Sequence, residues 1–195
     1  MTIKTFNINT DKTAFVRAYL PDSIAGLPFC EKRPAVLIFP GGGYEYCSDR
    51  EGEPIALQYL ALGYAAFVVT YSCNERFPEP LMDAAYIFYK IRMRAEEFKI
   101  DPQKMAVLGC SAGGHLAGCL ATMWSDIALT KTIGCEPEDL RPNAAILCYP
   151  VISGVTAPHE GSFKVLLGED ASRSDLSRLS LENLSLIHIS EPTRP

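Results

Sequence analysis

The chain has 195 residues, and its 18 Lys and Arg against 23 Asp and Glu give a formal net charge of −5. Hydrophobic residues make up 48% and charged residues 21% of the sequence, which is typical of one globular domain and excludes a disordered chain. The acidic balance, without any long run of like charges, argues against nucleic acid or an anionic membrane as a partner.

Strand and helix patterns alternate along the chain. Two early segments show moderate alternation, and four continuous apolar runs are typical of strands buried on both faces. The predicted strands are Thr2–Asn9, Ala14–Leu20, Ala35–Phe39, Tyr64–Tyr71, Met105–Gly109 and Ala144–Cys148. Helical spacing of apolar residues predicts helices over Glu53–Leu62, Pro80–Phe98 and Ala112–Trp124.

This order of elements predicts the α/β class, with a mostly parallel sheet and helices on both of its faces. Ile100–Pro102 is predicted as a turn, and Ser153–Asn183 as a loop with short helices of the kind that borders a site. No repeat or linker interrupts the pattern, so residues 1–183 are predicted to form a single domain.

The last segment is treated separately from the fold. Leu184–Arg194 resembles the translated sequence of an adapter used in preparing sequencing libraries, so residues 184–195 are expected to be an adapter-derived tail. On this interpretation His188 has no role, and the domain is incomplete at its C-terminus. We expect the uninterrupted gene to continue after Asn183 with a further strand ending in Asp and then a loop His.

Cysteine usage and the N-terminus predict a cytoplasmic protein. The start of the chain has no apolar segment of signal-peptide length, and no stretch has the roughly 18 apolar residues of a membrane helix. The seven cysteines form no C-x-x-C pair and are expected to be reduced thiols; they stand at positions 30, 47, 73, 110, 119, 135 and 148. No zinc-ligand spacing or dinucleotide fingerprint is present, so neither a metal nor a cofactor is predicted.

The central motif is Gly109-Cys-Ser-Ala-Gly113, which matches G-x-S-x-G between a predicted strand and a predicted helix. A serine on such a sharp turn is lifted out of the sheet, and the small residues two positions away let strand and helix approach. The motif therefore predicts Ser111 as a nucleophile at the N-terminus of a helix, where negative charge is favoured. A phosphate loop is excluded because His115 and Leu116 stand where it needs Lys and Ser or Thr.

A second motif, Pro40-Gly-Gly-Gly-Tyr44, directly follows the first of the apolar strands. Acyl transfer requires N–H donors for the oxyanion of a tetrahedral intermediate, and glycine leaves its backbone N–H unobstructed. One donor is expected from Ala112 and others from this glycine loop. A flexible turn is the alternative interpretation of a triple glycine, but the position upstream of a nucleophile turn favours the oxyanion hole.

Together these segments resemble the α/β-hydrolases of the esterase/lipase group with an HGGG-type loop, especially bacterial acetyl-xylan and feruloyl-esterase-like enzymes. The resemblance is carried by Arg33–Tyr44, Arg50–Pro54, Gly63–Ser72, Ile100–Pro102 and Gly109–Ala117. It implies an α/β-hydrolase fold, here without its C-terminal strands, and a serine carboxylesterase of small acetyl-type esters, including those of acetylated sugars. It also implies an acyl-enzyme on Ser111 and an oxyanion hole of Gly42, Gly43 and Ala112. Pro40 stands where many relatives have His, which leaves the N–H donors intact.

The other members of the catalytic triad are not expected within this chain. In this fold the acid and the His follow the serine after later strands, so the chain as written is expected to be nearly inactive. His115 is expected to pack near the glycine loop, and Tyr44, His115 and His159 are candidates for the pocket. A solvated loop position remains an equal alternative for His159.

Two other functions remain open from the sequence. A serine peptidase of the prolyl-oligopeptidase type shares the motif and the fold, although the Pro40–Tyr44 loop favours the esterase. A non-catalytic binding protein on the same fold is the other, and the intact Ser111 and glycine loop weigh against it. The predicted partner is a small-molecule ester.

Overall fold

The structure is a computed structural model that describes residues 1–7, 14–22 and 32–184. Its centre is a six-stranded sheet with the order β1-β2-β4-β3-β5-β6. The strands are β1 (Thr2–Asn7), β2 (Phe15–Leu20), β3 (Arg33–Phe39), β4 (Ala65–Thr70), β5 (Ile100–Cys110) and β6 (Ala144–Cys148). β1, β2 and β4 pair antiparallel, whereas β4, β3, β5 and β6 pair parallel. The predicted α/β class with a mostly parallel sheet is confirmed.

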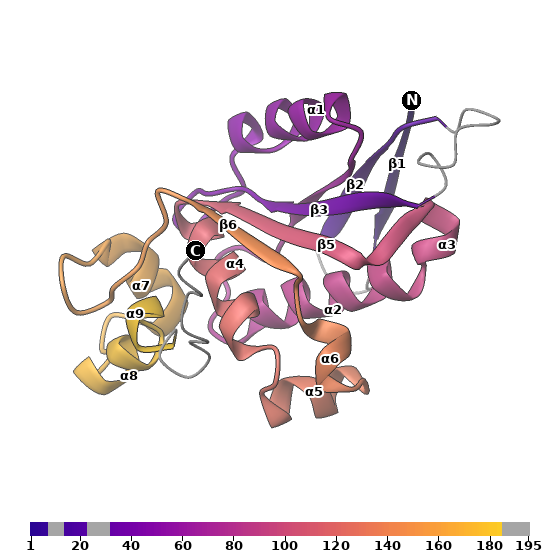
Figure 1. The fold of residues 1–195 in the computed structure, drawn as a ribbon. Helices are drawn as coiled ribbons and strands as arrows, with labels where there is room; N and C mark the ends of the chain where they lie inside the picture. The colour runs from indigo at the N-terminus through magenta and orange to yellow at the C-terminus, as the bar shows by residue number, and fades with distance from the viewer. Residues whose placement is uncertain (8–13, 23–31, 185–195) are drawn as a thin grey trace, which may run out of the picture.

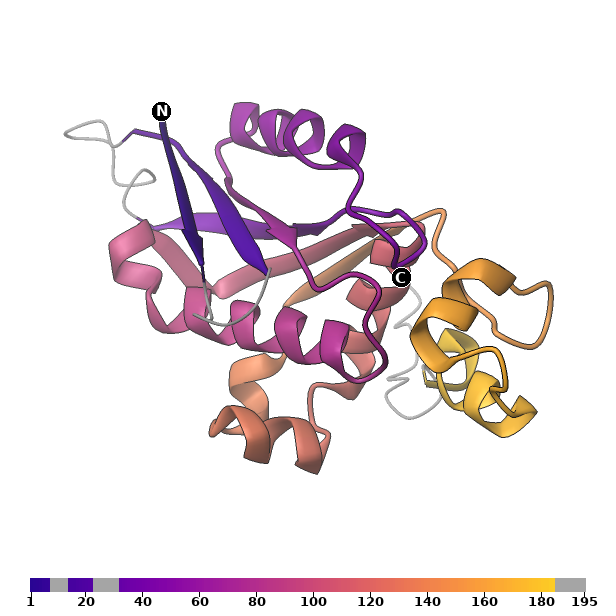
Figure 2. The same cartoon turned by 180° about the vertical axis from the view of Figure 1, so that it is seen from behind.

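Helices cover both faces of this sheet (Figures 1 and 2). The helices of the described residues are η2 (Asp49–Glu51), α1 (Glu53–Ala61), α2 (Glu79–Met93), α3 (Ala95–Phe98), α4 (Ala112–Met123), α5 (Ile127–Ile133), α6 (Pro137–Leu140), α7 (Glu160–Leu167), α8 (Arg173–Arg178) and α9 (Leu181–Leu184). On one face, α1 packs Ala56 against Val36 and Ile38 of β3. On the other, α2 and α4 cover a larger core that includes Leu37, Phe88 and Leu116.

The alternation of side chains along β3 explains why both cores form. Successive strand residues point to opposite faces, so Val36 and Ile38 join the α1 core while Ala35, Leu37 and Phe39 join the α2–α4 core. All five of these residues are 0% exposed. A continuous apolar run is therefore what a central strand between two helical layers needs.

The predicted helix Pro80–Phe98 is wrong in one respect, because the structure divides it at Arg94 into α2 and α3. The break turns Phe98 onto the sheet, where its ring lies 5.6 Å from Phe6 and 5.2 Å from Phe67. The Arg94 guanidinium binds both carboxylate oxygens of Glu97, at 2.7 and 2.8 Å, and holds the junction. Helical spacing alone did not reveal this one-residue interruption.

Two predictions about the strands also need correction. Ile100–Pro102 lies within β5 rather than in a turn, because Ile100 pairs with Arg33. The next pair is Ala35 with Met105, so the register shifts there and β5 carries the extra residues. β6 is present as predicted, but Ala144, Ala145 and Leu147 are exposed rather than buried. Among the described strands β6 pairs only with β5, so it forms an edge of the sheet.

The segment after β6 folds back as α7, α8 and α9, which gather beyond the ends of β5 and β6 (Figure 1). Short helices were predicted here. α7 and α8 begin at polar caps, where His159 accepts from Ser162 N and Ser172 accepts from Asp175 N. Leu181 of α9 packs against Gly118 of α4, where an added Cβ would lie 2.6 Å from Leu181 Cδ1. The helical segment is thereby joined to the helix that begins at Ser111.

The remaining sequence predictions have mixed outcomes. The six described cysteines are free thiols, as expected. Cys30, His188 and the last two residues of the predicted strand Thr2–Asn9 lie outside the described segments. In the described residues, no helix has the length and apolarity needed to span a membrane.

Candidate active site

Ser111 occupies the sharp turn between β5 and α4. Its backbone has φ 51° and ψ −118°, in a region that non-glycine residues rarely adopt. The turn is fixed by the carbonyl of Cys148, which accepts from Ser111 N at 3.0 Å, and by Val151 N, which donates to Ser111 O at 3.1 Å. The backbone on both sides of the strained residue is therefore tied to the end of β6.

The glycines of the motif are required by close backbone contacts. A Cβ on Gly109 would lie 2.0 Å from Gly113 O, and a Cβ on Gly113 would lie 2.0 Å from Phe39 O. Because these neighbours are backbone atoms, no side-chain rotation can relieve the overlap. The spacing of the motif thus reflects how tightly α4 crosses the ends of β3 and β5.

The glycine loop, defined as Pro40–Tyr44, lies beside Ser111. A Cβ on Gly41 would be 2.9 Å from Ser111 Cβ, so the two segments are in contact. Gly42 and Gly43 have φ values of 130° and 66°, which glycine adopts without steric cost. The loop is held from below by Tyr71, whose O–H donates to Pro40 O at 2.7 Å.

Three backbone N–H groups at this position are available as donors. Within the part of the chain that the structure describes, the N–H groups of Gly42, Gly43 and Ala112 donate no hydrogen bond. Ala112 is the first residue of α4, and the first N–H groups of a helix have no partner inside it. Such groups can stabilise an oxyanion that develops next to Ser111.

Glu51 bridges the glycine loop to the segment after β6, a contact that the sequence did not predict. Its Oε2 accepts from Gly41 N at 2.6 Å, and its Oε1 accepts from the hydroxyl of Tyr149 at 2.8 Å. The carboxylate also raises the pKa of Tyr149, which keeps the phenol protonated as a donor. Glu51 falls within the Arg50–Pro54 segment that carried the family resemblance, which was its one signal in the sequence.

We expect Glu51→Gln to destabilise this chain by about 1 to 3 kcal/mol, because the amide has one acceptor oxygen and its NH₂ opposes one of the two donors. Urea unfolding of residues 1–195 measures the change. Glu45→Gln, at an exposed carboxylate just after the glycine loop, is the matched control and should leave the midpoint unchanged. Equal midpoints for both variants would show that the Glu51 bridge contributes nothing.

Tyr44 and His115 form a buried pair behind the glycine loop. The Tyr44 hydroxyl lies 2.7 Å from His115 Nδ1, and His115 Nε2 lies 2.7 Å from Leu179 O. Because a carbonyl only accepts, Nε2 carries the proton and Nδ1 accepts from Tyr44. Both residues were candidates for the pocket, but in the structure they are buried, with exposed fractions of 2% for Tyr44 and 1% for His115. With both ring nitrogens engaged, His115 has none left for Ser111.

Burial lowers the pKa of His115, and this makes folding dependent on pH. The unfolded ring binds its proton near pH 6.5, whereas the folded ring resists protonation at that pH. The free energy of unfolding is therefore expected to fall as pH drops below about 6.5, by at most about 1.4 kcal/mol per pH unit from this residue. Urea unfolding at a series of pH values should show this slope, and His115→Gln should lack it.

Ser111 opens into a cavity of about 630 Å³ whose walls come from the segment after β6 and from α9. The lining residues are Ser111, Tyr149, Pro150, Val151, Ile152, Ser153, Thr156, Ala157, His159 and Glu182. His159 is exposed on this wall, and its Nδ1 lies 2.9 Å from Ser162 Oγ and accepts from Ser162 N at the start of α7. The structure brings His159, unlike Tyr44 and His115, to the same cavity as the serine.

A proton acceptor for Ser111 is not found among the described side chains. The structure gives Ser111 Oγ no hydrogen bond to any described His, Asp or Glu. Both ring nitrogens of His115 are bonded elsewhere, and the Nδ1 of His159 is bonded to Ser162. The described residues thus bring together the predicted nucleophile and the predicted oxyanion donors, without a general base.

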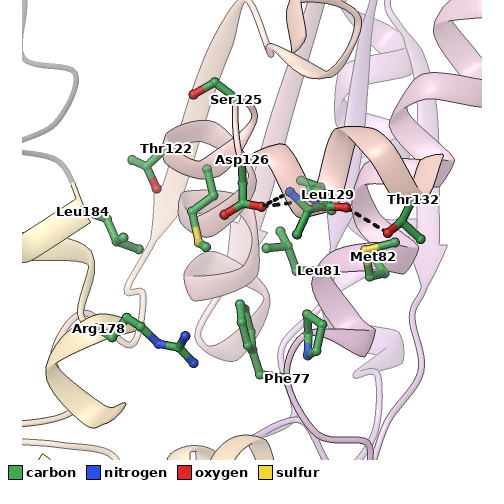
Figure 3. Close-up of a pocket in the computed structure, with 13 residues that line it drawn as sticks. Phe77, Leu81, Met82, Thr122, Ser125, Asp126, Leu129, Thr132, Arg178 and Leu184 are labelled. Carbon is green, nitrogen blue, oxygen red and sulfur yellow. Dashed lines mark hydrogen bonds between the residues drawn. The ribbon is translucent and has the colours of Figure 1, made fainter. Parts of the chain in front are cut away.

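A second cavity, of about 510 Å³, lies between α2, α4, α5 and α8 (Figure 3). Ser111 is not among the residues that line it. Leu81, Met82 and Leu129 give it mainly apolar walls. Asp126, which points toward it, accepts hydrogen bonds from Ala128 N and Leu129 N and so caps α5. The Asp126 carboxylate is thus occupied in capping α5.

Comparison with known proteins identifies the family of the chain. Residues 27–161 match the model of the BD-FAE family. The chain belongs to the BD-FAE family. This BD-FAE chain is 30% identical over 197 residues to an acetylxylan esterase of Xylanibacter ruminicola. The alignment covers 96% of this chain and 36% of that protein. It is 35% identical over 158 residues to endo-1,4-beta-xylanase B of Butyrivibrio fibrisolvens, in an alignment that covers 77% of this chain and 24% of that protein.

Solved structures of α/β-hydrolases resemble this BD-FAE chain and confirm the predicted fold. An acetyl ester-xyloside bifunctional hydrolase from Caldicellulosiruptor lactoaceticus superposes with a TM-score of 0.76 and 33% identity over 92% of this chain and 64% of that one. The α/β hydrolase MGS-M1 from a Medee basin deep-sea metagenome has a TM-score of 0.68 and 45% identity over 78% and 58%. The chain thus spans about a quarter to a third of the two curated relatives and less than two thirds of the two solved ones.

Proposed function

We propose that the protein is a serine carboxylesterase that hydrolyses small acyl esters, acetyl esters of sugars among them, through an acyl-enzyme on Ser111. One observation carries the proposal: a serine on a strained strand-to-helix turn lies against a glycine loop with unused N–H groups, at the wall of a cavity. This is the arrangement that acyl transfer requires.

In the proposed reaction, Ser111 Oγ attacks the ester carbonyl while its proton passes to a general base. The N–H groups of Gly42, Gly43 and Ala112 donate to the oxyanion, whose charge the N-terminus of α4 also favours. Collapse of the tetrahedral intermediate expels the alcohol and leaves the acyl group on Ser111. Water, activated by the same base, then releases the acid.

The base is proposed to come from outside the described residues. In this fold the acid and the His follow the serine in chain order. A His beyond α9 fits this order, because the chain covers 64% of the related bifunctional hydrolase. Neither described histidine is assigned the role, since both ring nitrogens of His115 are engaged and the structure shows no hydrogen bond between His159 and Ser111.

The substrate class is supported by the cavity and by the relatives. A volume of about 630 Å³ lies within the range of small-molecule sites. Two of the similar proteins are named for acetylxylan and for an acetyl ester-xyloside. Tyr149, Ser153 and Thr156 carry hydroxyl groups on the cavity wall, where the sugar portion of the ester can be placed.

The test is acetate release from an acetylated xylo-oligosaccharide by the whole protein that contains this chain, beside a prolyl peptide anilide. Ester hydrolysis without peptide hydrolysis is the expected result. The reverse preference would favour a peptidase, and no hydrolysis together with no fluorophosphonate adduct on Ser111 would favour a binding protein.

A further inference from the structure

Two cysteines connect the segment after the glycine loop to the segment after β4. The Sγ atoms of Cys47 and Cys73 lie 3.7 Å apart, and both side chains are half-buried. Both sulfurs also lie near the carbonyl oxygen of Tyr71, at 3.9 Å from Cys47 and 3.4 Å from Cys73. The pair is separated by 26 positions in sequence and takes no part in the esterase chemistry proposed above.

Hydrogen bonds hold the two segments together on either side of this pair. Asn74 N donates to Tyr44 O at 2.8 Å, and Asn74 Nδ2 donates to Glu45 O at 2.9 Å. The Tyr71 hydroxyl donates to Pro40 O at 2.7 Å. Because the backbones are already fixed side by side, the thiols stay in contact without any further ordering of the chain.

We propose that Cys47 and Cys73 are a redox-modification site, which a low-molecular-weight disulfide such as oxidised glutathione converts into an intramolecular disulfide. The sulfurs must approach from 3.7 Å to the covalent distance of about 2 Å, which side-chain rotation can supply when the backbones are held together. The product joins the segment after the glycine loop covalently to the segment after β4.

The two thiols have different roles in this exchange. The hydrogen bond from Cys47 lowers the pKa of Cys73, and the same contact together with burial raises the pKa of Cys47. Cys73 therefore supplies the thiolate that attacks a sulfur of oxidised glutathione, and one glutathione thiolate leaves. Once Cys73 is part of this mixed disulfide, the hydrogen bond that contributes most to the raised pKa of Cys47 is gone. Cys47 then attacks the Cys73 sulfur and releases the second glutathione.

Atoms and electrons balance in these two steps. The protons of Cys47 and Cys73 pass to the two glutathione thiolates, and the two electrons that the cysteines lose reduce the glutathione disulfide. No group held elsewhere in the protein is consumed.

Other described cysteines are less suited to this reaction. Burial raises the pKa of Cys119 to about 12, and burial is also the main cause that raises the pKa of Cys110 to about 11. Cys110 faces Cys148 across the β5–β6 register, which makes that pair the internal competitor. A thiol that stays protonated reacts slowly in exchange, so the Cys47–Cys73 pair should react first.

The test treats the purified, reduced chain with oxidised glutathione under native conditions and then alkylates it with iodoacetamide in denaturant. Mass spectrometry should find two fewer alkyl groups than in the untreated chain, and peptide mapping should find Cys47 cross-linked to Cys73. Alkylation of both cysteines, a stable glutathione adduct on the wild-type chain, or a disulfide between other cysteines would overturn the proposal.

Variants separate the two roles. Cys47→Ser should stop at a mixed disulfide between glutathione and Cys73, because the resolving thiol is missing. Cys135→Ser is the matched control, since Cys135 is also a half-buried free thiol, and it should form the Cys47–Cys73 bond as the wild type does. Loss of the bond in the Cys135 variant would assign the reaction to a different pair. None of these readouts depends on esterase activity.

Discussion

Replacing Ser111 by Ala in the whole protein is expected to lower kcat for an acetyl ester about ten-thousand-fold or more. The variant loses the nucleophile, and only the oxyanion donors and substrate binding remain to accelerate attack by water. KM should change little, because the missing hydroxyl contributes to bond formation rather than to the binding of the substrate. Initial rates of acetate release over a range of ester concentrations separate the two parameters.

Ser125→Ala provides the matched control, because Ser125 lies just beyond the opposite end of the helix that begins at Ser111. This variant should retain the wild-type kcat. A fluorophosphonate should add its mass to the peptide that contains Ser111 in the wild type and in Ser125→Ala, but not in Ser111→Ala. Undiminished ester hydrolysis by Ser111→Ala would remove the basis of the proposed mechanism.

Local patterns were sufficient to predict the central part of the fold. The run Ala35–Phe39 is apolar at every position because both faces of β3 are covered, and this is visible in the sequence without any partner. The turn at Ser111 was predictable for a similar reason, since Gly109 and Gly113 meet backbone atoms that any strand-to-helix crossing of this kind brings near. In both cases the constraint lies within a short segment.

Contacts between distant segments account for what was missed. Nothing near Glu51 in the sequence indicates that its carboxylate reaches Gly41 and Tyr149, the second of which is 98 positions away. His115 was expected to pack near the glycine loop, where its Nδ1 bonds the Tyr44 hydroxyl. Nothing in the sequence, however, indicates that its Nε2 bonds Leu179 O, 64 positions away. The short helices α5 and α6 lack the length at which helical periodicity becomes visible.

The interpretation of Gly113 can be tested through stability alone. We expect Gly113→Ala to destabilise residues 1–195 by more than about 4 kcal/mol, a large part of the stability of an ordinary domain. The new Cβ would lie 2.0 Å from Phe39 O and 2.4 Å from Pro40 O, so α4 must move away from β3 and the glycine loop. Urea unfolding followed by circular dichroism measures the loss.

Gly161→Ala is the control that isolates this crowding from the general effect of adding a methyl group. Gly161 lies in α7, and the nearest atom to an added Cβ is His159 Cε1 at 3.7 Å, an ordinary contact. Alanine should leave that helix unchanged or stabilise it by up to about 1 kcal/mol. If Gly113→Ala unfolded at the same urea concentration as Gly161→Ala, α4 would not cross the end of β3 at contact distance. The position of the Ser111 turn beside the glycine loop would then lose its steric basis.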